Sequence, residues 1–267
     1  MSPAGLILSV STINLGKPSA WVQEFIGTLI MIAFTFSPGK WVGVDSIYVE
    51  WTVHAVGVVL ADYISNGPHV NPAVSVTMYS LGKCDYFEMY TRIGGSMAGG
   101  LVAFPIFLQF SESLSLTALG GPAFDDDNST SEEADLAFLS EYLATFLLMM
   151  AIYFLNWELN FGKYHYWIKQ TLTAVFIRYL IVVFPAAGPA MNPMLGTAWA
   201  VFSSGGGSLP SDTAHYAIYW VASTLGGLTS AYVYTVYAGG TFFGQKAMFG
   251  PMKSDQVEKK SSKKKKQ

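Results

Sequence analysis

The sequence predicts an all-α membrane protein with six transmembrane helices and two re-entrant half-helices, arranged as an inverted repeat. Three observations carry this prediction: a low content of charge, six long apolar stretches, and two motifs that occur twice in the same order. Of the 267 residues, 51% are hydrophobic and only 12% are charged, whereas a soluble domain carries about 25% charged residues. The missing charge argues against a water-soluble globular protein.

Six apolar stretches account for the predicted transmembrane helices. Crossing about 30 Å of hydrocarbon takes roughly 18 or more mostly apolar residues, and each stretch is apolar nearly all round. They cover residues 20–37, 48–65, 88–110, 138–157, 166–186 and 214–238. Two shorter apolar stretches, 72–81 and 193–203, begin with Asn-Pro, a helix-start signal. Because these two are too short to cross a membrane, we expect them to be half-helices.

The distribution of charge predicts the orientation of the chain and its division into segments. Lys83, Arg92 and Lys163 lie on the same side as the lysine-rich tail if both termini are cytoplasmic, as the positive-inside rule favours. The acidic loop then faces outward, and its sequon at Asn128 is either glycosylated or a chance match. The predicted segments are an N-terminal cytoplasmic segment (1–19), a first repeat (20–110), an acidic extracytoplasmic loop (111–137), a second repeat (138–240) and a basic cytoplasmic tail (241–267).

Several classes of site are not predicted. Cys84 is the only cysteine, so an internal disulfide cannot form. The four histidines are scattered, which does not favour a metal site. No nucleophile–base pattern is present, so we expect no catalytic residues, no cofactor and no enzymatic activity. The expected surroundings are a lipid bilayer rather than nucleic acid.

The two halves of the chain carry the same two motifs in the same order. Glu24 is followed by an aromatic, an aliphatic, a small residue and threonine, and Glu141 is followed by the same pattern. Further on, Gly-Pro-x-x-Asn-Pro occurs around Asn71 and again around Asn192. The offsets from glutamate to asparagine, 47 and 51 positions, are nearly equal. Because each unit contains three spans, the copies lie in opposite orientation, an arrangement that places a site near the midplane on half-helices.

Asparagine followed by proline suits the start of a half-helix at membrane depth. Proline tolerates the first turn, and asparagine caps the helix while its side-chain amide can still donate. Two such starts meeting at the midplane would bring two amide donors and two positive dipole ends together. A water molecule there would turn its oxygen toward them, which breaks a proton wire and repels cations. The preceding residues are expected to run extended, with backbone carbonyls lining the path: Gly67, Pro68, His69, Gly188, Ala190 and Met191.

Charged residues within predicted spans are costly and are usually paired or functional. Glu24 and Glu141 are expected to accept hydrogen bonds from the backbone of the nearby re-entrant loops, with contact to a solute as the alternative. Arg178 is expected to pair with Glu141 or Glu50. His54 either lines the path or packs as a buried histidine.

These motifs resemble the aquaporin, or major intrinsic protein, family over roughly residues 20–240. The resemblance implies a right-handed bundle of six helices with two half-helices, one pore per subunit, and a homotetramer in the lipid bilayer. It implies a passive, proton-excluding channel for water and for other small neutral solutes, such as glycerol, hydrogen peroxide or ammonia. The residues of the paired pore motif are then Asn71, Pro72, Ala73, Asn192, Pro193 and Met194.

The second motif departs from the family pattern. The family has Asn-Pro-Ala followed by arginine, but here Met194 and Leu195 follow Asn-Pro, so the arginine of the outer filter is absent. Arg178 is two positions from Leu180, so we expect it on nearly the opposite face of the helix from Leu180. We therefore do not expect it to replace the missing filter arginine. Carried over residue by residue from the family, the filter positions fall on Trp51, Leu180, Pro189 and Leu195. The assignment of Trp51 is open by one position along the second span. This apolar filter resembles the unorthodox branch, which includes plant small basic intrinsic proteins and animal intracellular aquaporins.

Two other function classes stay open from the sequence. Secondary transporters also use inverted repeats, and a non-conducting junction or structural membrane protein could share the fold. The location is open as well. The chain ends Lys264-Lys265-Lys266-Gln267, which is either a dilysine-like retrieval signal for the endoplasmic reticulum or an ordinary basic tail of a plasma-membrane protein.

Overall fold

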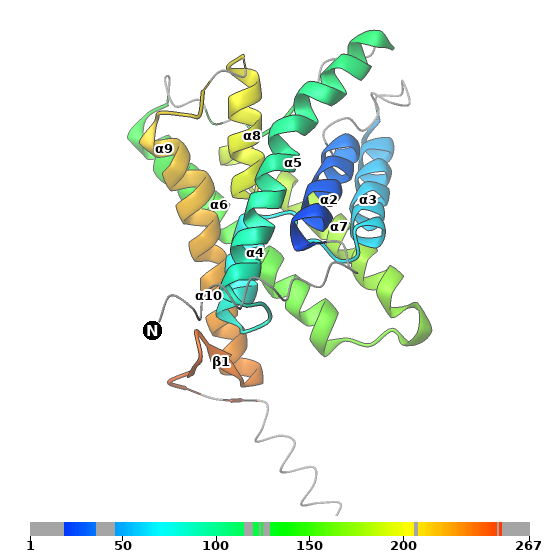
Figure 1. Cartoon of the computed structure of the whole chain (residues 1–267). Coiled ribbons are helices and arrows are strands. Elements are labelled where there is room, and N and C mark those ends of the chain that lie inside the picture. Colours follow the sequence, from blue (N-terminus) through cyan, green and yellow to red (C-terminus); the bar gives the residue numbers. More distant parts are fainter. Residues whose placement is uncertain are drawn as a thin grey trace, which may run out of the picture.

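The computed structural model describes residues 19–35, 46–114, 120–122, 124, 129–205, 208–249 and 251–252. Within these ranges the chain is mostly helical, and its helices form one bundle (Figure 1). The sequon residue Asn128 and the terminal lysines Lys264 and Lys265 lie outside the described residues.

The same order of helices occurs twice along the chain. The first half consists of α2 (Ala20–Thr35), α3 (Ile47–Ile64), the half-helix α4 (Pro72–Ser80) and α5 (Tyr86–Ser113). The second half consists of α6 (Ser131–Tyr153), α7 (His165–Val183), the half-helix α8 (Pro193–Ser203), and a helical run of α9 (Thr213–Tyr216), a π-helical segment (Ala217–Ala222) and α10 (Ser223–Ala238). A π-helical segment (Phe154–Glu158) ends α6, and 3-10 turns lie at Gly162–Tyr164 and Pro185–Ala187. An antiparallel hairpin of β1 (Thr241–Phe242) and β2 (Gln245–Lys246) follows α10.

Each of the six predicted spans coincides with a helix, and each predicted half-helix lies where Asn-Pro begins it. Three helical stretches of the described chain are long and apolar enough to cross a membrane by length and composition alone: Ile47–Ile64, Tyr86–Phe110 and Ser131–Glu158. The helix α2 is a shorter apolar helix of 16 residues. The π-helical segment divides the last span into separate helices, although the run from Thr213 to Ala238 has no break. The predicted all-α class with two half-helices is therefore confirmed.

Local capping signals explain where two of the long helices begin. The Asp85 carboxylate accepts a hydrogen bond from the backbone N–H of Glu88 at 2.7 Å, which caps α5. Thr130 and Glu133 form a reciprocal capping box at the start of α6. Each cap satisfies backbone N–H groups that have no partner within the first helical turn.

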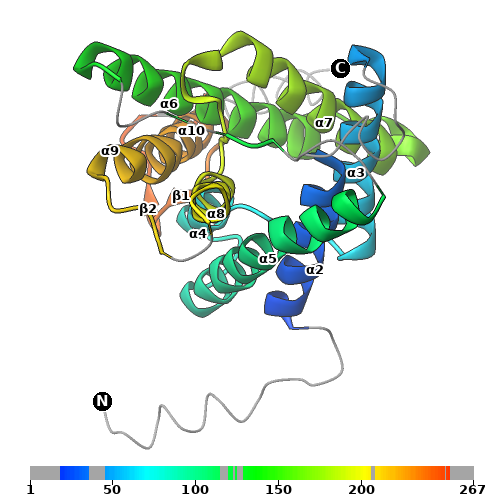
Figure 2. The ribbon, with the colours of Figure 1, turned by 90° about the horizontal axis from the view of Figure 1, so that it is seen from above.

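The two halves pack around the half-helices in a matching way. In each half the first helix packs along the last, α2 against α5 and α6 against α10, and α3 packs against α7 across the two halves. Each half-helix packs against the last helix of the other half, α4 against α10 and α8 against α5. Seen from above, α4 and α8 lie within the ring of longer helices (Figure 2).

Paired glycines allow these helices to approach closely. A Cβ atom at Gly95 would overlap with the carbonyl of Trp21 in α2, and one at Gly226 would overlap with the carbonyl of Tyr142 in α6. Further along the same two helices, Gly100 and Gly227 face the half-helix of the other half. Small residues at such crossings are typical of packing between membrane helices.

The distribution of polarity differs from that of a soluble protein. Fully buried side chains include the carboxylates of Glu24 and Glu141, whereas large apolar side chains are exposed on the outer faces of the helices. Among these are Val56, Ile106, Leu139, Val182 and Val233. An apolar outside around a partly polar interior is the arrangement that a lipid environment favours.

Candidate functional site

The two half-helices begin in the same way. The side-chain oxygen of Asn71 accepts a hydrogen bond from the N–H of Ala73 at 2.9 Å. The side-chain oxygen of Asn192 accepts one from the N–H of Met194 at 3.0 Å. Proline follows each asparagine at the first helical position, where its missing N–H costs no hydrogen bond. The repeated Asn-Pro therefore produces two equivalent capped helix starts.

The residue before each asparagine has an unusual backbone conformation. Val70 and Met191 both have φ of 49°, a left-handed conformation that is strained for residues with a side chain and rarest for a β-branched one. The sequence led us to expect extended backbone here. The strain turns each peptide so that its carbonyl faces the other half of the chain. Gly67 and Gly188, with φ of 76° and 53°, share the left-handed region at lower cost.

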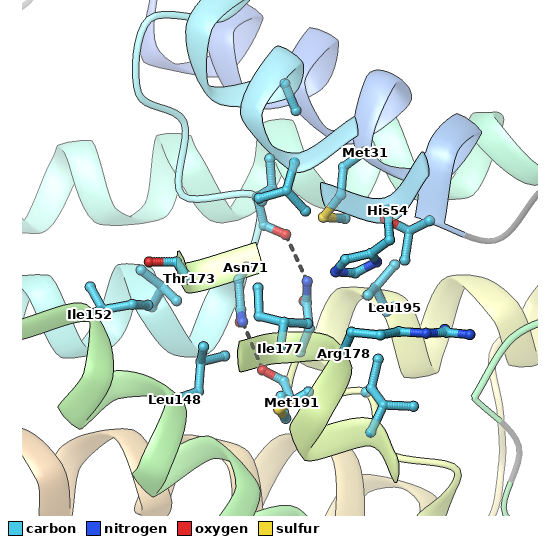
Figure 3. A pocket seen from close by; sticks show the side chains of 18 of the residues that line it. Met31, His54, Asn71, Leu148, Ile152, Thr173, Ile177, Arg178, Met191 and Leu195 are labelled. Carbon is cyan, nitrogen blue, oxygen red and sulfur yellow. Dashed lines mark hydrogen bonds between the residues drawn. The ribbon is translucent and has the colours of Figure 1, made fainter. Parts of the chain in front are cut away.

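Those carbonyls connect the two half-helix starts. The side-chain nitrogen of Asn71 donates to the carbonyl of Met191 at 2.7 Å. The side-chain nitrogen of Asn192 donates to the carbonyl of Val70 at 2.8 Å. Figure 3 draws both bonds as dashed lines within one cavity. Because each amide nitrogen carries two hydrogens, each asparagine keeps a second N–H beyond this crossed pair.

Two buried carboxylates hold the loops that lead to the half-helices. The oxygens of Glu24 accept from the N–H groups of His69 and Val70 at 2.7 and 2.6 Å, and Arg92 also binds this carboxylate at 2.6 Å. The carboxylate of Glu141 accepts from the N–H of Ala190 at 3.2 Å. The hydroxyl of Ser223 donates to the same carboxylate at 3.0 Å. The two loops thus have equivalent anchors, but only the first anchor includes an ion pair within the described chain.

A cavity of about 680 Å³ passes the crossed asparagines. Both Asn71 and Asn192 line it, and it follows α3 from Glu50 to Asp62, a length of about 18 Å at 1.5 Å per residue. Between its two ends the cavity has mainly apolar walls, which include Met31, Val58, Val74, Leu148, Ile152 and Ile177. At one end lie Glu50, Arg178 and the loop residues Gly120–Pro122, and at the other lie Asp62, Asn156 and Gln170. We call these the Arg178 end and the Gln170 end.

The structure brings most of the predicted loop residues to this cavity. From the first loop Gly67, Pro68, His69 and Asn71 line it, and from the second Gly188, Pro189, Ala190, Met191, Asn192 and Leu195. Pro72, Ala73, Pro193 and Met194 are buried in the first turns of the half-helices instead. His69 is further held by a contact of 3.0 Å between its Nδ1 and the hydroxyl of Ser75.

Two of the four predicted filter residues are not among the cavity-lining residues. Leu180 is fully buried against Ala144, Leu148 and Met191, and Trp51 lies on α3 outside the lining. Leu180 faces the packed interior, and a neighbouring face of α7 is the one that meets the cavity. That face carries Ile177, Arg178 and Ile181.

The sequence did not place Arg178 and Glu50 in the path, and it left open whether His54 lines the path or packs as a buried histidine. Arg178 binds the carboxylate of Glu50, one of the two partners expected for it. One turn from Glu50, His54 also lines the cavity. Figure 3 shows Arg178, His54 and Leu195 on one side of the crossed asparagines, with Ile152 and Thr173 on the other. The signal in the sequence was two opposite charges, at 50 and 178, within the second and fifth spans.

The comparisons with known proteins agree with this arrangement. The family model described as Major intrinsic protein matches residues 11–234. Aquaporin-9 of Mus musculus is 25% identical over 196 residues, which cover 64% of this chain and 65% of that protein. The chain thus spans about two thirds of the length of this relative. Glycerol uptake facilitator protein of Haemophilus influenzae is 26% identical over 258 residues, which cover 82% of this chain and 93% of that protein.

A solved structure has the same fold. The aquaglyceroporin from Plasmodium falciparum aligns with a TM-score of 0.62 at 20% identity, over 81% of this chain and 94% of that chain. At this identity the alignment supports the arrangement of helices and not the identity of a solute.

Proposed function

Because the chain belongs to the major intrinsic protein family, whose members are membrane channels and not enzymes, we propose that it is a passive channel for water and small neutral solutes. The observation that carries this proposal is the crossed pair of Asn71 and Asn192 inside a single cavity. The cavity follows the bundle past both half-helix starts, and a passive channel needs such a path.

We propose that the two asparagines orient each passing solute. The free N–H of each amide would donate to a solute oxygen, and each half-helix start contributes the equivalent of about half a positive elementary charge. A water molecule held in this way points its hydrogens away on both sides, so protons cannot hop along a continuous chain of waters. The same positive field repels cations. Neutral solutes would pass, whereas protons and metal ions would not.

The lining favours solutes larger than water as well as water itself. Apolar side chains form most of the wall between the two ends, and polar groups come from the two loops and from a few helix residues such as His54 and Thr173. Such a path suits a molecule with a carbon face and a hydroxyl face. Leu195 lines the cavity where the family has arginine, so the space near it is less restricted. We therefore propose glycerol-sized polyols as solutes beside water, in keeping with the name of one relative, the glycerol uptake facilitator protein.

Replacing Leu195 tests this selectivity. Leu195→Arg would add a long cationic side chain to the lining, and we expect it to reduce glycerol permeability more than water permeability. Stopped-flow light scattering on liposomes gives both values from the same preparation. If the variant leaves the ratio of the two permeabilities unchanged, Leu195 does not restrict the path.

The assembly and orientation remain part of the proposal. We propose a homotetramer in the bilayer with both termini in the cytoplasm, which makes the Arg178 end the outer end of the path. Plasma membrane and endoplasmic reticulum are both compatible locations.

Flux through liposomes distinguishes the function classes. Liposomes with the purified protein should pass water and glycerol faster than empty liposomes, and a pH-sensitive dye inside should report no added proton leak. Hydrogen peroxide and ammonia measured in the same way would complete the solute range. Flux that requires a gradient of a second ion would indicate a transporter. An absence of flux for all four solutes would contradict the channel and favour a junction or structural protein.

A further inference from the structure

We propose that Arg178, Glu50 and His54 form the selective constriction of the channel, as a polar site for neutral polyhydroxy solutes at the Arg178 end. This proposal rests on the channel function proposed above and adds the residues that select the solute. It differs from the apolar filter expected from the sequence, because Arg178 reaches the cavity from α7 and not from the second half-helix.

The ion pair is open toward the cavity. Arg178 donates through one terminal nitrogen to one oxygen of Glu50. The side chains of Arg178 and Glu50 are 19% and 32% exposed, and both line the cavity. An arginine has five N–H donors and a carboxylate has two acceptor oxygens, so the pair keeps donors and acceptors beyond its own bond. Within the described part of the chain, Nε of Arg178 has no hydrogen-bond partner.

His54 supplies a second unpaired polar group beside this pair. It is 1% exposed and lines the cavity. Among the described residues only the backbone of Ala174 can pair with the ring, so at least one of its two nitrogens has no hydrogen-bond partner. A buried polar group without a partner is unfavourable unless a mobile molecule satisfies it. The cavity beside the ring is the place from which a solute hydroxyl or a water would do so.

The chemistry of the site favours polyols over ions. Because Arg178 is neutralised by Glu50, the constriction carries no net charge and has no strong attraction for either anions or cations. It offers donors and acceptors side by side, and a hydroxyl group both donates and accepts. Neighbouring hydroxyls of one molecule can therefore bind Arg178 and Glu50 together. Leu195 on the same side of the crossed asparagines provides an apolar surface for the carbon chain (Figure 3).

A purely structural role for the ion pair makes a different prediction. Glu50 on α3 and Arg178 on α7 connect the two helices at one end of the cavity. Near the other end of the same helices, the hydroxyl of Tyr166 donates to the carboxylate of Asp62 at 2.6 Å. If the ion pair only braced the helices, removal of either connection would have similar effects on transport. If the pair selects solutes, only its own removal would change the ratio of solute permeabilities.

The test is the ratio of glycerol to water permeability in proteoliposomes, which does not depend on how much protein is incorporated. In Glu50→Leu/Arg178→Leu we expect this ratio to fall about tenfold, the size expected for a lost hydrogen bond to a charged group. His54→Phe should lower it in the same direction and provides the test if the double variant does not fold. Tyr166→Phe is the matched control and should leave the ratio unchanged.

The outcomes separate this inference from the channel function. Unchanged ratios in the double variant and in His54→Phe, with a conducting wild type, would overturn the constriction but not the channel. An equal fall in the Tyr166→Phe control would also overturn it and indicate bracing. A wild type that conducts neither solute would contradict the channel itself.

Discussion

Asn71 and Asn192 are linked crosswise, since each side-chain nitrogen donates to the carbonyl of the residue that precedes the other. Each asparagine therefore caps its own half-helix with its oxygen and holds the other half of the chain with its nitrogen. An exchange of this kind couples the position of the two half-helices, so that neither start can move without breaking a buried hydrogen bond.

Removal of one asparagine should lower both the stability of the protein and its permeability to solutes. Asn192→Ala loses the cap on α8 and the bond to Val70, and each loss costs about 1 kcal/mol. We expect a lower thermal unfolding temperature in detergent and a lower glycerol permeability. Asn160→Ala is the control, because Asn160 accepts from the N–H of Gly162 in an exposed loop away from the cavity. Equal effects of the two substitutions would mean that the crossed bonds add nothing.

The two loop anchors should differ in their contribution to stability. Glu24 is fully buried and binds Arg92, whose side chain is 13% exposed. Glu24→Gln would leave that cation with Glu88 alone, at a cost of about 3 kcal/mol. Glu141→Gln keeps one oxygen for the N–H of Ala190, and its NH2 group can donate to the hydroxyl oxygen of Ser223, whose proton then goes to the carbonyl of Tyr219, so this change should cost about 1 kcal/mol. The thermal unfolding temperatures of both variants in the same detergent show which substitution costs more stability. A larger loss for Glu141→Gln would contradict the assigned contacts.

Adjacent glycines in α5 should respond differently to the same substitution. A Cβ at Gly95 would overlap with the carbonyl of Trp21, so Gly95→Ala should destabilise the protein by about 1–3 kcal/mol. A Cβ at Gly94 would meet the Trp21 ring at 3.7 Å, an ordinary contact. Gly94→Ala should therefore be neutral or slightly stabilising, since alanine favours the helix. Similar unfolding temperatures for the two variants would refute the close approach of α2 and α5.

The sequence identified the parts of the fold that are repeated in both halves. Glu24 and Glu141, and Asn71 and Asn192, occur at nearly equal offsets, and a duplicated pattern can be recognised without knowledge of the packing. The left-handed conformation of Val70 and Met191 could not be predicted, because it results from contacts with the other half.

The place of Arg178 and Glu50 in the cavity lining was not predicted, for a different reason. Each span is apolar nearly all round, so periodicity does not indicate which face of α7 meets the cavity. A shift of two positions separates Leu180, which packs inside, from Arg178, which lines the cavity. Transfer of filter positions from the family assumes an unchanged helix rotation, and the rotation is set by packing that the sequence alone does not give.

The cysteine background must be controlled before labelling can locate the solute path. Cys84 lies in the turn between α4 and α5, where burial raises the pKa of its thiol to about 11. At neutral pH it is therefore mostly protonated and reacts slowly with thiol reagents. The substitution Cys84→Ser removes the remaining slow reaction of the native thiol with the label.

The central claim, that solutes pass through the cavity beside the crossed asparagines, is tested most directly by blocking that cavity. In the Cys84→Ser background, Thr173→Cys places a thiol in the lining of α7, and Leu172→Cys places one on the adjacent outward position, where the native side chain is 43% exposed. Both variants are treated with a neutral benzyl methanethiosulfonate, and glycerol flux into liposomes is measured before and after. We predict that labelling abolishes flux through Thr173→Cys and leaves Leu172→Cys unchanged. Full flux through labelled Thr173→Cys, with the label verified by mass spectrometry, would contradict the assigned path.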